Sequence, residues 1–146
     1  MKKILLLLTF FCAAAYGQKS FDSLSVAVIL AEGNSCNFES KTLATFAEAE
    51  VRHNRIRLEN EPTKSDAIIL ITPLVMEVTS NHCAASLSVE FMTYRRAQLK
   101  NKKEVTSRLV YCRRNLIATY EKSLMQRELN DSTKELINEC ITALER

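Results

Sequence analysis

The chain contains little glycine and little proline, with 2 of each in 146 residues. Long flexible linkers are therefore not expected, and the sequence shows neither an internal repeat nor a low-complexity tract. Hydrophobic residues make up 47% of the chain, which is not the composition of a disordered protein. The length suits a single domain with one hydrophobic core.

Recognisable catalytic and cofactor-binding motifs are also missing. The sequence has no CxxC, no GxGxxG, no Walker-type loop and no HExxH. His53 and His82 have no partner at metal-ligand spacing, and His82 and Cys83 would point to opposite faces of a strand. We therefore expect no cofactor and no metal, and we favour a protein that is not an enzyme. An enzyme that acts through residues without a motif is the remaining alternative.

The first 17 residues have the pattern of a secretory signal peptide. Lys2 and Lys3 give a basic start, residues 4–15 are apolar, and small residues precede a cleavage site after Gly17. The apolar run is shorter than the roughly 20 residues that a membrane-spanning helix needs. We predict a mature domain of residues 18–146 that is periplasmic or secreted, with no transmembrane segment after cleavage.

A lipid anchor at Cys12 is the main alternative for this N-terminus. Phe11 stands directly before Cys12, where a lipoprotein signal has a small residue. Cleavage at Cys12 would also shorten the apolar run. The pattern therefore favours Cys12 as an ordinary residue of the signal peptide.

Four cysteines remain after cleavage: Cys36, Cys83, Cys112 and Cys140. An even number in an exported domain predicts up to two disulfides, although free buried thiols are an alternative. If the strand from Val105 and the C-terminal helix are antiparallel neighbours, Cys112 and Cys140 come level along them. We favour that pair, with Cys36 as the competing partner. Cys83 is expected at the opposite end of the sheet, so a Cys36–Cys83 bond fits this arrangement poorly.

Hydrophobic periodicity predicts five strands and two helices. The expected strands cover residues 24–30, 55–59, 67–79, 83–92 and 105–120, and the expected helices cover residues 37–52 and 132–145, with 124–129 as an earlier turn of the second. In the fourth strand, residues 83, 85, 87, 89 and 91 should face the core.

Several local features carry further expectations. Asn37 is a candidate N-cap of the first helix, and Ser132 with Glu135 fits a capping box for the second. The apolar run at 67–79 suggests a strand covered on much of both faces, with a bulge or bend at Pro73. Glu77 and Glu90 are expected to face solvent, residues 61–66 to form a turn, and residues 95–104 to form a polar connection.

The element order β-α-β-β-β-β-α predicts an α+β fold, a single mostly antiparallel sheet of about five strands packed by two helices. The first two strands flank a helix and can be parallel. In this order, and in segments such as residues 26–29 (Val-Ala-Val-Ile), the chain resembles small envelope modules. Examples are the N-terminal domain of the Tol-system propeller protein and the periplasmic domain of the curli-secretion pore. The resemblance implies an exported module and transfers no functional residue.

Basic residues are concentrated in one predicted hairpin. Only Glu104 opposes them between residues 95 and 114, whereas residues 18–94 carry six basic and ten acidic residues. The basic set is Arg95, Arg96, Lys100, Lys102, Lys103, Arg108, Arg113 and Arg114. Such a patch attracts anions and steers association. The alternative is a soluble hairpin whose charges prevent edge-to-edge aggregation.

Outside the cytoplasm, the partners that fit this charge are an acidic protein surface or an anionic envelope component such as lipid headgroups or a glycan. We expect no nucleic acid, because only Tyr94 and Tyr111 could stack on bases there. The sequence therefore favours a non-enzymatic binding or accessory module, for example a part of an envelope assembly. A small exported inhibitor of an enzyme is the alternative.

Overall fold

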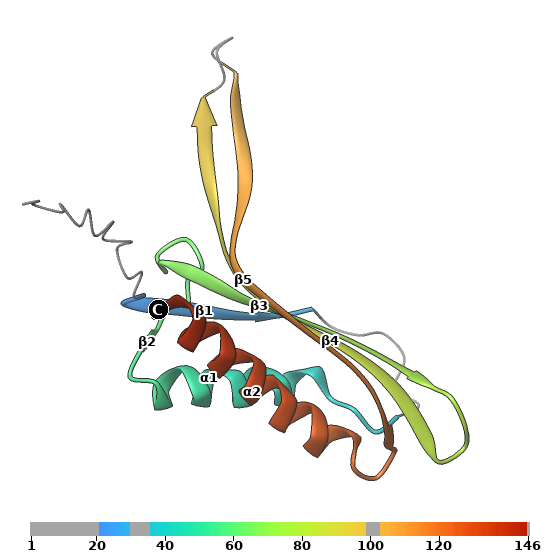
Figure 1. Ribbon diagram of the computed structural model, residues 1–146. Helices are drawn as coiled ribbons and strands as arrows, with labels where there is room; N and C mark the ends of the chain where they lie inside the picture. Colours follow the sequence, from blue (N-terminus) through green and yellow to red (C-terminus); the bar gives the residue numbers. More distant parts are fainter. Residues whose placement is uncertain (1–20, 30–35, 99–102, 146) are drawn as a thin grey trace, which may run out of the picture.

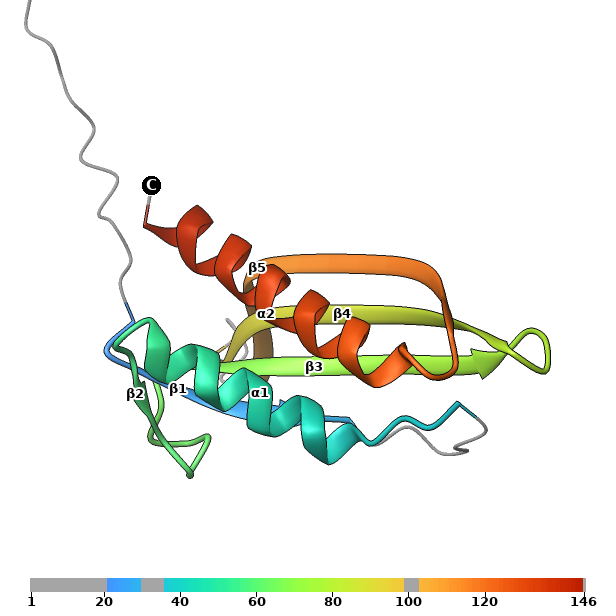
Figure 2. The same ribbon diagram turned by 90° about the horizontal axis from the view of Figure 1, so that it is seen from below.

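The computed structural model describes residues 21–29, 36–98 and 103–145. The predicted signal peptide, including Cys12, lies outside these ranges. The described residues form one five-stranded sheet with both helices on the same face (Figures 1 and 2). The elements are β1 (Ser23–Val28), α1 (Ser40–His53), β2 (Arg57–Leu58), β3 (Ala67–Glu77), β4 (His82–Gln98), β5 (Glu104–Glu121) and α2 (Met125–Leu144). The predicted α+β fold is confirmed.

The strand order in the sheet is β2-β1-β3-β4-β5. β1 is parallel to both β2 and β3, whereas the two β4 interfaces are antiparallel. α1 is the crossover between the parallel strands β1 and β2. It carries the chain from the end of the sheet where β1 finishes back to the end where β1 begins. β1 and β3 consequently finish at the same end of the sheet, which is also where α1 and β4 begin.

The core lies between the sheet and the two helices. The predicted alternation in β4 is confirmed, because Cys83, Ala85, Leu87, Val89 and Phe91 are all buried. Neighbouring strands and both helices complete this core with Leu24, Ile69, Ile71, Leu43, Val51, Leu129 and Ile137. Burial of such aliphatic and aromatic side chains is the main favourable term in folding.

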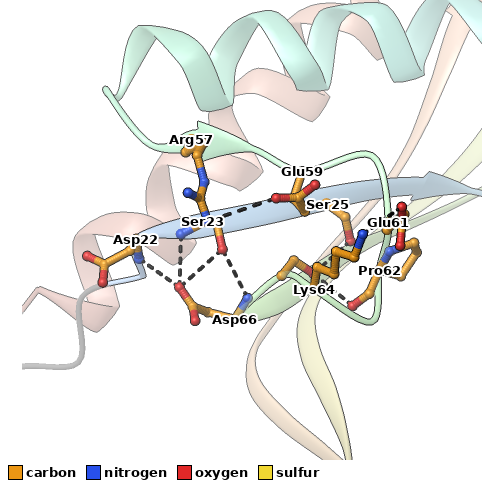
Figure 3. Close-up of polar contacts among 10 residues, drawn as sticks. Asp22, Ser23, Ser25, Arg57, Glu59, Glu61, Pro62, Lys64 and Asp66 are labelled. Carbon is orange, nitrogen blue, oxygen red and sulfur yellow. Dashed lines mark hydrogen bonds and ion pairs between the residues drawn. The ribbon is translucent and has the colours of Figure 1, made fainter.

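A polar clamp fixes the start of β1 to the start of β3 (Figure 3). The Asp66 carboxylate accepts hydrogen bonds from the backbone N–H groups of Asp22 and Ser23, both at 2.9 Å. In the preceding turn, the Ser65 hydroxyl donates to the Pro62 carbonyl at 2.9 Å. The turn expected at residues 61–66 is therefore present, and it holds the two strands in register.

The earlier turn expected at residues 124–129 is confirmed as the start of α2, whereas the predicted caps of both helices are wrong. α1 begins at Ser40, and Asn37 adopts a left-handed conformation (φ 52°) three residues earlier, so the predicted N-cap is wrong. Asn tolerates this region better than most residues. α2 begins at Met125, which places Ser132 inside the helix and makes the predicted capping box wrong. The apolar face of α2 extends back to the buried Met125 and Leu129, and packing of these residues outweighs the local signal.

A bulge or bend was expected at Pro73, and the bulge is absent, since the pairing of β3 with β4 continues through Pro73 without a shift. Ile29 donates a backbone hydrogen bond to the Ile71 carbonyl, so Ile71 points its backbone groups toward β1. The backbone of Pro73, two residues later, also faces β1, but the last pair between β1 and β3 is Val28 with Ile71. The missing N–H therefore removes no bond from the sheet.

The two disulfides join Cys112 to Cys140 and Cys36 to Cys83, with Cα–Cα distances of 5.6 and 6.1 Å. The favoured Cys112–Cys140 pair is confirmed. The expectation that Cys36 and Cys83 lie at opposite ends is wrong. They meet because the parallel β1 and β3 deliver the loop before α1 and the start of β4 to the same end of the sheet.

Candidate binding surface on the β4–β5 hairpin

The β4–β5 hairpin is much longer than the strands beside it. β4 and β5 pair from His82 with Glu121 to Gln98 with Glu104, whereas β3 pairs with β4 only as far as Met92. The outer part of the hairpin therefore continues as a two-stranded arm. Figure 1 shows this arm rising from the face of the sheet that lies opposite the helices.

A β-bulge marks the point where the arm leaves the sheet. Phe91 pairs with Cys112 and Met92 pairs with Val110, so Tyr111 is an extra residue in β5. Bulges of this kind bend and twist the strand that carries them. The Tyr111 ring contacts Phe21, with 5.3 Å between ring centroids, and Phe21 in turn contacts Phe91 at 6.3 Å. The bend is thus supported by aromatic packing.

The polar connection expected at residues 95–104 is wrong over residues 95–98, which continue β4. Arg95 and Arg96 are both exposed and, as strand neighbours, point to opposite faces of the arm. A strand with solvent on both faces has no hydrophobic alternation. The periodicity that located the other strands was therefore absent here.

Glu90 is buried, with 5% of its surface exposed, so the expectation that it faces solvent is wrong. It lies on the face opposite the helices, directly across from Arg113, whose Nε donates to Glu90 Oε1 at 2.6 Å. The Arg108 guanidinium forms an ion pair with the other oxygen, Oε2. One carboxylate therefore balances two of the eight basic residues of the hairpin and leaves one positive charge in excess.

Arg114 faces the helices and pairs with Glu139 of α2, with 3.1 Å between Nε and Oε2. Three of the basic residues are therefore engaged with carboxylates at the base of the hairpin. In the described part of the chain, neither Arg95 nor Arg96 has an ion pair. Lys103 is exposed at the outer end of the arm, and Lys100 and Lys102 lie outside the described residues.

The face of the sheet opposite the helices also carries exposed apolar side chains, which the sequence pattern did not predict. Leu74, Met76 and Ile117 are 60%, 57% and 82% exposed. They line a shallow hollow of about 130 Å³ with Ala84 and Ser86. The apolar run of β3 suggested a strand covered on much of both faces, but the two described helices cover only one of them.

Within the described residues, no group of three or more His, Cys, Asp or Glu side chains could hold a metal ion. Neither described helix is long and apolar enough to cross a membrane.

The sequence matches no protein-family model and no curated protein. Among the solved structures that are similar to the chain are two bacterial lipoproteins, both at 16% sequence identity. A minor lipoprotein from Acinetobacter baumannii has a TM-score of 0.44, and the match covers 84% of this chain and 93% of the other. The rare lipoprotein B from Shewanella oneidensis has a TM-score of 0.26, with 85% and 89% covered. These comparisons assign the chain to no family.

Proposed function

We propose that the protein is a non-enzymatic exported binding or accessory module, and that the outer part of its β4–β5 hairpin binds an anionic component of the cell envelope. The observation that supports this most directly is the position of Arg95 and Arg96. Both are exposed on the arm and have no ion pair within the described residues, whereas Arg108, Arg113 and Arg114 are paired at its base.

The base of the arm favours binding by a preorganised surface. The Glu90 carboxylate joins Arg108 and Arg113 of β5, and the Phe21 and Tyr111 rings support the bend. An arm held in this way loses less conformational freedom when a partner binds. The excess of basic residues would steer an anionic partner toward the arm and make the association rate depend on salt.

The test compares Arg95→Gln/Arg96→Gln with a control that removes the same charge elsewhere. Arg57→Gln/Arg127→Gln is suitable, because these arginines are 69% and 65% exposed and lie away from the arm. We expect the exported protein to bind vesicles containing phosphatidylglycerol, or to retain envelope proteins in a pull-down at low salt. The hairpin variant should lose most of this binding, and the control should keep it.

Equal binding by the two double variants would contradict the role of the arm. The two assays separate a lipid partner from a protein partner. Recovery of a single foreign enzyme as the retained protein would instead support the inhibitor alternative.

A further inference from the structure

β5 is an edge strand along its whole length. It is the last strand in the sheet order, and no described residue pairs with its outer side. Figure 2, seen from the helix side, shows β5 at the margin of the sheet, with α2 crossing in front of it. Edge strands expose unpaired N–H and C=O groups that can bind another strand.

The pairing with β4 identifies the backbone groups that are free. Lys122, which follows β5, donates its N–H to the Asn81 carbonyl at 2.9 Å, so even-numbered residues of this segment point their backbone groups toward β4. Backbone direction alternates along a strand. Five odd-numbered residues therefore turn their N–H and C=O groups outward: Arg113, Asn115, Ile117, Thr119 and Glu121.

The same five residues expose their side chains on the face opposite the helices. Ile117, at the centre of the five, is 82% exposed. Residues 113–121 contain no Lys and no Pro, and these are the residues that commonly protect an edge from pairing. The Cys112–Cys140 disulfide and the Arg114–Glu139 ion pair join β5 to α2 at residues 112 and 114, before the central residue Ile117.

We propose that the partner of this edge is a second copy of the chain, paired β5 to β5 in antiparallel orientation about a two-fold axis at Ile117. Ile117 then lies opposite its symmetry mate, Asn115 lies opposite Thr119, and Arg113 lies opposite Glu121. All three are hydrogen-bonded pairs, because each of these residues points its backbone outward. The interface is self-complementary, as two-fold symmetry requires.

Charge complementarity favours this register and favours a second copy of the chain as the partner. Arg113 shares the single Glu90 carboxylate with Arg108, and within the described residues Glu121 has no ion pair. The register places each Glu121 beside the Arg113 of the other copy, and symmetry provides this pair twice. A shift of two residues would place Thr119 or Ser123 opposite Arg113 and would lose both pairs.

The first test measures the mass of the exported, oxidised protein by sedimentation over a range of concentrations. We expect a concentration-dependent dimer. Ile117→Lys places two like charges directly opposite each other and should give a monomer. Leu74→Lys is the matched control, because Leu74 is exposed on the same face but belongs to the interior strand β3. This control should remain dimeric, and circular dichroism should show both variants folded.

The second test reads the register with single cysteines, since the four mature cysteines are all in disulfides. Hydrogen-bonded antiparallel neighbours have Cα atoms roughly 5.5 Å apart, a distance that a disulfide can span. Ile117→Cys should form a disulfide-linked dimer by itself. Asn115→Cys and Thr119→Cys should each stay monomeric on a non-reducing gel, but a mixture of the two should cross-link.

Three results would overturn the proposal. They are a wild-type monomer at every concentration, a dimer that survives Ile117→Lys, and equal self-cross-linking by all three cysteine variants. If the wild type is monomeric at every concentration, a strand of a different protein becomes the alternative partner of the β5 edge.

Discussion

Glu90 of β4 and Arg113 of β5 lie directly opposite each other, and Arg113 Nε donates to Glu90 Oε1 at 2.6 Å. The carboxylate is buried although it lies on the face opposite both described helices. Its two oxygens form ion pairs with Arg113 and Arg108 of β5. The charged hairpin thus has a structural base and a separate exposed arm.

Glu90→Gln should destabilise the protein by about 2 kcal/mol. Loss of one partner from a buried ion pair typically costs about 3–5 kcal/mol, and the value should be lower here because both arginines are partly exposed. Urea unfolding measures the change. Glu48→Gln is the control, since Glu48 forms an exposed pair with Arg52 on α1 and should cost less than about 0.5 kcal/mol. Equal losses of unfolding free energy in the two variants would show that the buried ion pair stabilises the protein no more than the exposed one.

Removal of either disulfide should cost roughly 3–4 kcal/mol. The two bonds close loops with sequence separations of 28 and 47 residues, and the cost follows from the chain entropy regained on unfolding. Cys112→Ala/Cys140→Ala and Cys36→Ala/Cys83→Ala can be compared by denaturant unfolding. A non-reducing peptide map should show the two pairs of the structure, and four free thiols would contradict both bonds.

The sequence predicts that export is followed by cleavage after Gly17. Mass spectrometry of the exported protein should find Gln18 at the N-terminus, as glutamine or in its cyclised form. A diacylated Cys12 would instead show that the chain is a lipoprotein.

Removal of charge from Lys100, Lys102 and Lys103 together should change the free energy of unfolding by no more than about 0.5 kcal/mol per site, as is usual for surface substitutions. It should weaken binding to an anionic partner at low salt. The difference from wild type should shrink as salt rises, because exposed charges are screened beyond roughly 8 Å at physiological ionic strength. Unchanged binding at low salt would mean that these lysines serve only solubility.

The sequence predicted the parts of the fold in which one face of an element is buried and the other is not. The alternation from Cys83 to Phe91 located the core face of β4, and the pattern in the second half of α2 located the buried Leu136, Ile137, Cys140 and Ile141. It also favoured the Cys112–Cys140 bond, because that pair depends only on distances along two adjacent elements.

The errors arose where tertiary contacts override local signals. The capping pattern at Ser132 is real as a sequence pattern, but packing of Met125 and Leu129 starts the helix a turn or more earlier. The Cys36–Cys83 bond depends on the parallel pairing of β1 with β3, which no local pattern specifies. Glu90 forms an ion pair with Arg108, which lies beyond the bulge at Tyr111, and the sequence around this bulge gives no turn signal.

The placement of the disulfides divides the chain at the tip of the hairpin. Both cysteines of one bond precede Gln98, and both cysteines of the other follow Glu104. After a single proteolytic cut between these two residues, no disulfide would therefore link the two fragments. The cut would give two pieces, each closed by its own bond and held to the other by the β4–β5 ladder and the shared core, which makes this tip the natural place to split the protein for fragment complementation.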